Sequence, residues 1–177
     1  MITPDTKDWT WVLDRPCPEC GYHGAAVGHD DVAGLLRRSA AAWREVLAGD
    51  PAALRTRPRE DTWSPLEYAA HVRDVFGVYD ERLALMLTQD GPHYPNWDQD
   101  ATAVEDDYNA QDPAAVSAEL ARRAAKLADA FDEVEGDQWQ RTGFRGDGAA
   151  FTVDSFARYF IHDPLHHLHD VDRPLAL

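Results

Sequence analysis

Two proline-capped helix starts constrain the fold more than any other feature of this 177-residue chain. Ser64 precedes Pro65, and Glu67 stands at the third helical position, so the hydroxyl and the carboxylate can each accept a backbone N–H that a helix start leaves free. Proline costs little at the first helical position, because its missing N–H is not needed there. The pair Asp112-Pro113 repeats the signal. Both segments are therefore predicted to be helices.

The hydrophobic periodicity predicts four helices, over about 30–47, 65–88, 113–134 and from 152 onward. No segment alternates convincingly at period two, so we predict an all-α fold. Connections that are short at 48–63 and 135–151 and longer at 91–111 suit an up-and-down or crossover four-helix bundle. Residues 1–28, rich in Pro, Gly and aromatic residues, are expected to form an irregular arm over a bundle of residues 29–177.

The charge of the chain argues against nucleic acids and anionic membranes as partners. The formal net charge is −15, from 32 acidic and 17 basic residues. Affinity for nucleic acid depends on Lys and Arg that neutralise phosphates, and anionic lipid repels an acidic surface. No apolar run reaches the roughly 20 residues of a membrane-spanning helix, and no signal peptide is recognisable at the N-terminus. We therefore expect a cytoplasmic protein with a hydrophobic core.

Four of the eight histidines lie in one nine-residue stretch near the C-terminus. His162 and His166 are four residues apart, so they lie one turn apart on the same face of a helix, a spacing that suits two imidazoles on one metal ion. His169 continues this face, and His167 points elsewhere. Pro164 removes one helical hydrogen bond and is expected to kink the helix between the paired histidines.

His71, at the edge of the apolar face of the second predicted helix, is a candidate third ligand. Three histidines would leave coordination positions open to water or substrate, as in catalytic sites. The residues alone allow two other interpretations. His71 can be a hydrogen-bonded core histidine, and the stretch from His162 to His169 can be a surface segment that scavenges metal.

Two motifs resemble the DinB-like superfamily, which includes the bacillithiol and mycothiol S-transferases. The segment Trp63-Ser64-Pro65-Leu66-Glu67-Tyr68-Ala69-Ala70-His71 resembles its W-S-x-x-E-x-x-x-H helix start, and His162-x-x-x-His166 is similar to its H-x-x-x-H motif. The resemblance covers about residues 30–170 and implies a four-helix bundle in which His71, His162 and His166 hold a divalent metal. Leu168-His169 stands where the family often has Gly-Gln, so His169 is a candidate extra ligand or a donor to one.

The resemblance also implies an activity, the conjugation of a low-molecular-weight thiol to a small electrophile. The metal would be zinc or nickel, with iron or manganese as alternatives, and a homodimer is compatible with the fold. Candidate substrate-binding residues are Tyr159, Arg158, Arg82 and Trp97. A metal-dependent hydrolase or isomerase on the same three histidines is an alternative, and so is a non-enzymatic metal-binding stress-response module. Trp97 can equally pack on the bundle as part of an ordered connector.

The arm contains the only two cysteines of the chain, Cys17 and Cys20, with the C-x-x-C spacing of a zinc knuckle. His23 and His29 follow, so a four-ligand structural zinc site is one interpretation. The alternative is a reduced pair of thiols in a turn. A thioredoxin-like redox role is disfavoured, because the βαβ context of such motifs is missing.

Overall fold

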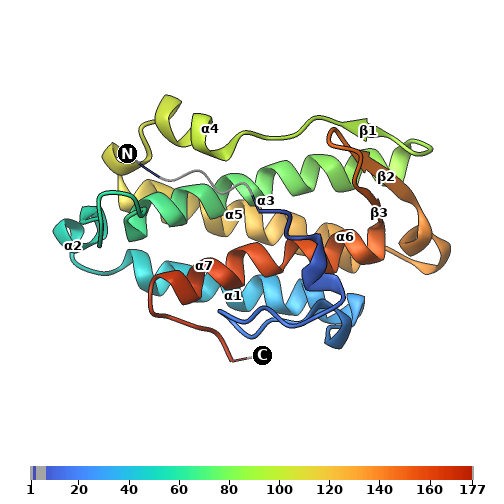
Figure 1. The fold of residues 1–177 in the computed structure, drawn as a ribbon, viewed down its shortest axis with the longest axis horizontal. Coiled ribbons are helices and arrows are strands. Elements are labelled where there is room, and N and C mark those ends of the chain that lie inside the picture. Colours follow the sequence, from blue (N-terminus) through green and yellow to red (C-terminus); the bar gives the residue numbers. More distant parts are fainter. Residues whose placement is uncertain (1, 3–6, 177) are drawn as a thin grey trace.

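The computed structural model describes residue 2 and residues 7–176, and its long helices match the four predicted segments (Figure 1). The fourth predicted helix is divided in two. The helices are α1 (Val32–Leu47), α3 (Pro65–Thr88), α5 (Pro113–Asp132), α6 (Val153–Phe160) and α7 (His162–Asp170). A shorter helix, α2 (Pro51–Arg55), lies in the first connection. No helix in the described part of the chain is both long and apolar enough to cross a membrane.

The predicted caps are present at the starts of α3 and α5. The Ser64 hydroxyl accepts the Glu67 N–H at 3.3 Å, and the Glu67 carboxylate accepts the Ser64 N–H at 2.8 Å. Arg57 also donates to this carboxylate, at 2.9 Å through Nε. Asp112 accepts the N–H of Ala115 at 3.1 Å. Because caps of this kind contribute about 1 kcal/mol each, they define where the bundle helices begin.

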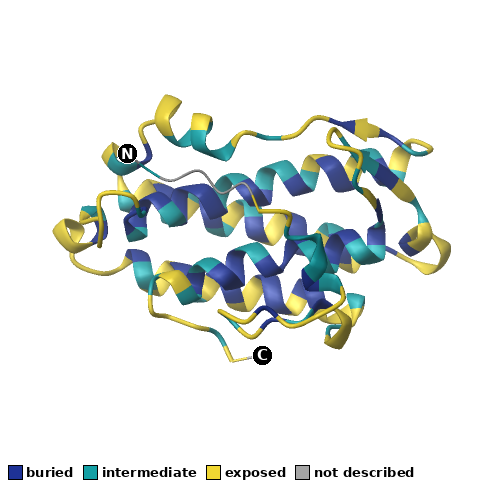
Figure 2. Ribbon diagram, in the orientation of Figure 1, coloured by how far each residue is buried: buried dark blue, intermediate teal, exposed yellow. Residues whose placement is uncertain are grey.

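Aromatic side chains from three helices meet in the middle of the bundle. The ring centroid of Phe160 lies 6.1 Å from that of Phe76, 4.7 Å from that of Tyr79 and 6.0 Å from that of Phe131. Figure 2 shows the buried faces of the long helices turned toward one another. Burying a side chain of this size contributes roughly 1.5–3 kcal/mol, so the cluster fixes α3, α5 and α6 against each other.

A small sheet departs from the all-α prediction. It contains β1 (His93–Tyr94), β2 (Thr142–Arg145) and β3 (Ala150–Thr152), with β2 parallel to β1 and antiparallel to β3. Strands of two to four residues are too short to show a period-two pattern in the sequence. The sheet lies at one end of the bundle and joins the long connection to the hairpin that precedes α6 (Figure 1).

The fourth predicted helix is broken at Ile161, just before the paired histidines and not between them, where Pro164 predicts the kink. α6 ends at Phe160, Ile161 is in a turn, and α7 begins at His162. The indole nitrogen of the buried Trp43 donates a hydrogen bond of 3.2 Å to the carbonyl of Pro164, which binds α7 to α1.

The described part of the arm, residues 7–28, packs on α6 and includes the short 3₁₀ turns Thr10–Leu13 and Gly24–Ala26. Val12, Cys17 and Tyr22 are buried there. The Tyr22 hydroxyl donates to the carbonyl of Arg158, in the last turn of α6. The arm is therefore part of the core, and Cys17 lies beside His166 in the middle of α7.

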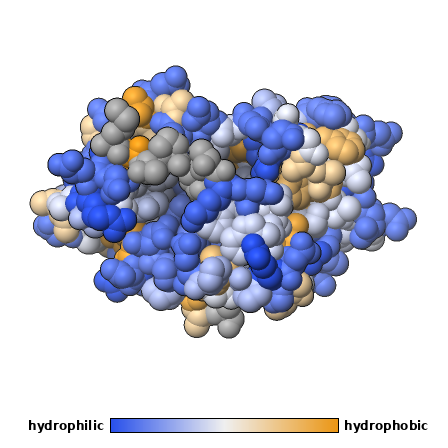
Figure 3. Space-filling model, in the orientation of Figure 1, coloured by the Kyte–Doolittle hydropathy of each residue, from blue (hydrophilic) through white to orange (hydrophobic). Residues whose placement is uncertain are grey.

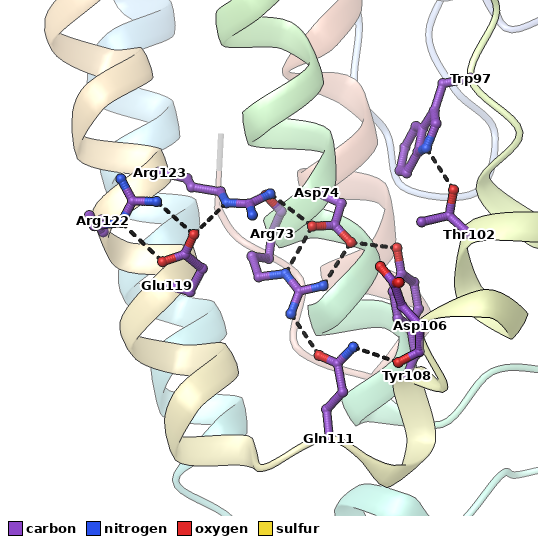
Figure 4. A network of polar contacts seen from close by, with 10 residues as sticks. All are labelled: Arg73, Asp74, Trp97, Thr102, Asp106, Tyr108, Gln111, Glu119, Arg122 and Arg123. Carbon is purple, nitrogen blue, oxygen red and sulfur yellow. Dashed lines mark hydrogen bonds and ion pairs between the residues drawn. The ribbon is translucent and has the colours of Figure 1, made fainter.

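The long connection contains α4 (Gln99–Glu105) and a 3₁₀ turn at Tyr108–Ala110, and a polar network holds it to α3 and α5 (Figure 4). The Asp74 carboxylate accepts from the Tyr108 hydroxyl at 2.6 Å, from Arg73 at 2.7 Å and from Arg123 at 2.8 Å. Within the connection, the Trp97 indole nitrogen donates to the Thr102 hydroxyl at 2.8 Å. These bonds fix the position of the indole above α3.

Candidate metal centres

The first two turns of α7 present two interleaved pairs of side chains of the types that bind metals. His162 and His166 are four residues apart, and Asp163 and His167 have the same spacing one residue further along. A helix advances about 100° per residue, so the two pairs point in different directions. Each pair meets different partners from the rest of the chain, and two separate clusters of potential ligands result.

The histidine–aspartate cluster consists of His71, Asp163 and His167. The His71 Nε2 atom lies 3.4 Å from each oxygen of Asp163, and the His167 Nε2 atom lies 3.8 Å from Asp163 Oδ2. Ligand atoms on a tetrahedral ion with bonds of 2.0–2.2 Å are separated by about 3.4 Å. The three side chains therefore fit one divalent ion, which two imidazoles and one carboxylate would hold with positions left open.

Three neighbouring side chains contact the histidines of this cluster. The His167 Nδ1 atom lies 2.8 Å from Asp170 Oδ2, a carboxylate–histidine contact of the kind that orients histidine ligands. The Trp97 indole stacks on His71 with ring centroids 5.4 Å apart and an interplanar angle of 3°, and Trp63 contacts the same imidazole at 5.2 Å. The His71 ring is fully buried, and its Nδ1 atom has no hydrogen-bond partner in the described part of the chain.

The charges of the cluster favour an ionised carboxylate. Burial raises the pKa of Asp163, but the adjacent His71 and His167 more than offset this, and the pKa lies well below its ordinary value. A permanently ionised carboxylate beside two imidazoles attracts a cation and is ready to bind it without losing a proton.

The cysteine–histidine cluster consists of Cys17, Cys20, His162 and His166. The Cys17 sulfur lies 3.7 Å from His166 Nδ1, and the rings of the two histidines lie 4.9 Å apart. Burial raises the pKa of Cys20 to about 12 and lowers that of His162 to about 4. His162 is therefore neutral at physiological pH, the form in which imidazole binds metals.

Aromatic and acidic groups surround the second cluster. The Trp9 ring lies 5.2 Å from that of His162 and 5.0 Å from that of His166. Glu19, between the two cysteines, places Oε2 3.4 Å from His166 Nε2. Asp170 Oδ1 lies 3.8 Å from the same nitrogen, so this carboxylate stands between the two clusters.

A cleft of about 840 Å³ runs past both clusters. The face of the molecule in Figure 3 is largely hydrophilic, and the lining of the cleft is mixed. Aromatic and basic side chains line it together with Asp163 and His167: Tyr79, Arg82, Trp97, Arg145 and Tyr159. Such a volume accommodates a small molecule beside the metal ligands.

The structure divides the predicted three-histidine set between the two clusters. It does not bring His71 together with His162 and His166, but places it with Asp163 and His167. The reason is angular: each member of one pair lies about 100° from its neighbour in the other. From the sequence, His167 is expected on a face that points elsewhere, whereas in the structure this face of α7 meets His71.

The other predicted site residues lie in several places. Arg82, Trp97 and Tyr159 line the cleft, whereas Arg158 pairs with Asp154 and also lies 3.5 Å from the Gly24 carbonyl, on the arm side of α6. The side chain of His169 is 42% exposed and belongs to neither cluster.

Of the predicted zinc ligands in the arm, only the cysteines join a cluster. His29 contacts Asp154 at 3.0 Å and stacks on Trp139 at 4.2 Å. His23 is absent from both clusters of the described residues. Sequence reasoning missed Asp163, His167 and Arg145. The spacing Asp163-x-x-x-His167 is the signal that would have identified the first two.

Comparison with known proteins agrees with the fold. The model of the DinB superfamily matches residues 35–171. YfiT from Bacillus subtilis, described as a probable metal-dependent hydrolase with an unusual four-helix bundle topology, superposes with a TM-score of 0.73 at 20% identity over 81% of this chain and 84% of that one. The mycothiol-dependent maleylpyruvate isomerase superposes with a TM-score of 0.64 at 15% identity.

The chain covers 62% of the isomerase, with 85% of its own length aligned. No curated protein matches the chain in sequence. At such identities the structural similarities establish the fold alone, and the family match extends over most of the bundle. The chain therefore belongs to the DinB superfamily.

Proposed function

We propose that this protein is a metal-dependent enzyme that transfers a low-molecular-weight thiol to a small anionic electrophile. The observation that carries the proposal is the three-ligand histidine–aspartate cluster, which borders a cleft of about 840 Å³ with a buried arginine in its wall. A divalent metal bound by His71, Asp163 and His167 would supply a Lewis acid that lowers the pKa of a thiol in its open position.

Arg82 favours an anionic ligand. Its residue is 8% exposed, its guanidinium donates to the Pro95 carbonyl at 2.9 Å and lies 4.9 Å from the Tyr94 ring centroid. It forms no ion pair with a carboxylate of the described residues. Because buried charges are normally paired, an unpaired guanidinium in a cleft wall supports a bound carboxylate as its partner.

Tyr159 is a candidate hydrogen-bond donor to the same ligand. Burial raises the pKa of its hydroxyl above the ordinary value although Arg145 opposes the shift, so the group is protonated at neutral pH. Arg145 donates to the Tyr159 oxygen at 3.0 Å, which leaves the tyrosine's own hydrogen to point toward a bound molecule.

The test is a thiol-conjugation assay with mycothiol, bacillithiol and glutathione against small electrophiles that carry a carboxylate. The similarity to the mycothiol-dependent isomerase is the reason to include that thiol. We expect turnover that requires both a thiol and a metal and that disappears in Asp163→Asn. His169→Ala, which changes an exposed histidine on the same helix, is the matched control.

Metal-dependent turnover of esters or amides in the absence of any thiol would overturn the proposal in favour of the hydrolase alternative. Acidic side chains in the cleft wall, including Asp61, Asp98 and Asp100, offer bases for such a reaction.

A further inference from the structure

The second cluster has the composition of a closed structural metal site. It combines two thiols from the arm with two imidazoles from α7, and these four ligand atoms all lie within 4.8 Å of one another. Two cysteines and two histidines form one of the common tetrahedral zinc sets, and soft sulfur ligands select zinc over calcium or magnesium. We propose that Cys17, Cys20, His162 and His166 bind a structural zinc ion that fastens the arm to the bundle.

The separation of one sulfur and one nitrogen ligand agrees with a common ion. Zinc bonds of about 2.3 Å to sulfur and 2.0–2.1 Å to nitrogen place tetrahedral S and N ligands about 3.6 Å apart. The Cys17 sulfur and His166 Nδ1 are separated by 3.7 Å. The residues Cys17, His162 and His166 are 1%, 4% and 7% exposed, so three of the four ligands are shielded from solvent.

His162 carries an independent indication of a ligand. Its Nε2 atom is buried and has no hydrogen-bond partner in the part of the chain that the structure describes. An unpaired buried polar atom costs roughly 1–3 kcal/mol in comparable cases, so such atoms are uncommon without a partner. A metal ion beside the two thiols supplies a partner for this imidazole.

The backbone of the arm is shaped for two sulfur ligands. Gly21 has φ of 78°, a conformation that glycine adopts easily, and its N–H donates to the Cys17 carbonyl at 2.9 Å. The Cys17 N–H donates to the Tyr22 carbonyl at 2.7 Å, which closes the turn. The two cysteines are not joined in a disulfide, and the turn directs both toward α7.

A neighbouring carboxylate completes the arrangement. Glu19, inside the same turn, lies 3.4 Å from His166 Nε2, on the side of the ring away from the Cys17 sulfur. Histidine ligands of metals are usually oriented by a carboxylate or carbonyl on their second nitrogen. The turn therefore contributes two ligands and the group that orients a third.

This site differs in role from the histidine–aspartate cluster. Four protein ligands leave no open position, so the ion would stabilise the fold without contacting a substrate. It would join residues 17 and 20 to residues 162 and 166, and so hold the arm against α7, whose histidines line the cleft.

The test is cobalt substitution of the untagged full-length protein, kept under reducing conditions. We expect wild-type protein to show sulfur-to-cobalt charge transfer in the near ultraviolet and intense tetrahedral bands in the visible. The charge transfer should disappear in the Cys17→Ser/Cys20→Ser double variant, and the visible bands should weaken to those of an ion at the histidine–aspartate cluster. The charge transfer should persist in His71→Ala, which alters only the other cluster, and in His23→Ala/His29→Ala, which removes the nearby histidines of the arm.

A wild-type protein without charge transfer would overturn the proposal, and so would a spectrum that depends on His23 or His29 and not on His166. Hydrogen exchange provides a second measurement for variants that fold poorly. In the wild type, chelation should accelerate exchange across residues 7–28, and unchanged exchange would contradict the site. Neither readout uses activity, so the outcome is independent of the proposed reaction.

Discussion

The two clusters share the first two turns of α7 and both border the cleft, but they differ in the number and kind of their ligands. The histidine–aspartate cluster offers three ligands and borders a cleft of about 840 Å³. The cysteine–histidine cluster offers four, two of them sulfur atoms from the arm, and Trp9 of the arm contacts both of its histidines. The difference arises from what each helix face meets: α3 supplies one buried histidine on one side, and the arm supplies two thiols on the other.

Asp170 lies between the two clusters, and its two carboxylate oxygens contact histidines of different clusters. Oδ2 lies 2.8 Å from His167 Nδ1, whereas Oδ1 lies 3.8 Å from His166 Nε2. A single carboxylate thus contacts a histidine of each cluster, and the contact is closer at the histidine–aspartate cluster.

The largest expected loss of activity comes from changes to the histidine–aspartate cluster, which leaves coordination positions open. Asp163→Asn and His167→Gln each remove a ligand charge or atom, so we expect activity to fall more than about 100-fold, beyond the 10–100-fold typical of outer groups. Elemental analysis should show one equivalent of metal lost and the other retained. His169→Ala should change neither quantity. Full activity in both ligand variants would contradict the assignment.

Asp170→Asn is expected to weaken metal binding at the open cluster by about 10–100-fold, because it removes the carboxylate that orients His167. The longer contact with His166 predicts a smaller change at the cysteine–histidine cluster. Competition with a chromogenic chelator measures both affinities. Equal losses at the two clusters would show that the 2.8 Å and 3.8 Å contacts are not distinguished in solution.

Arg82→Gln should raise KM for a carboxylate-bearing substrate by roughly tenfold or more, since hydrogen bonds to charged groups contribute about 1.5–3 kcal/mol. Metal content should not change, because Arg82 belongs to neither cluster. Arg158→Gln is the control, since this arginine pairs with Asp154 outside the cleft. Similar kinetic changes in both variants would remove the case for an anion subsite.

Asp74→Asn should loosen the long connection, which places Trp97 against His71 of the histidine–aspartate cluster. It should leave the cysteine–histidine cluster intact. Burial raises the pKa of Asp74, but bonds from Arg73 and Tyr108 lower it below its ordinary value of 3.8. The carboxylate therefore stabilises the fold above pH 3.8, and this contribution is lost as the pH falls toward the lowered value.

Thermal unfolding measured against pH should show this acid-side loss in the wild type and a weaker dependence in Asp74→Asn. The variant should unfold with about 1–3 kcal/mol less free energy, and the fluorescence of Trp97 should change with its segment. If Asp74→Asn lost as much stability at acid pH as the wild type does, carboxylates other than Asp74 would account for the pH dependence.

Much of the fold followed from local chemistry. The capped starts at Ser64 and Asp112 and the break beside Pro164 depend on neighbouring residues only, so the sequence contains the necessary information. The three-stranded sheet did not, because pairing His93 with Phe144 is a contact between distant segments. Short strands leave no periodic signal of their own.

The types of residue in the candidate site could be predicted from the sequence, but which of them lie together could not. Histidine spacing identified α7 as a source of ligands, and the C-x-x-C turn identified the cysteines. Which pair on α7 faces His71 depends on the rotation of the helix by one residue, about 100°, and this rotation depends on packing between distant segments that the spacing of residues does not reveal.

Anomalous diffraction at the zinc edge, from crystals of the untagged protein grown with zinc, tests the division into two clusters most directly. The account predicts two peaks, one bounded by His71, Asp163 and His167 and the other by Cys17, Cys20, His162 and His166. A single peak joining His71 to His162 and His166 would contradict it.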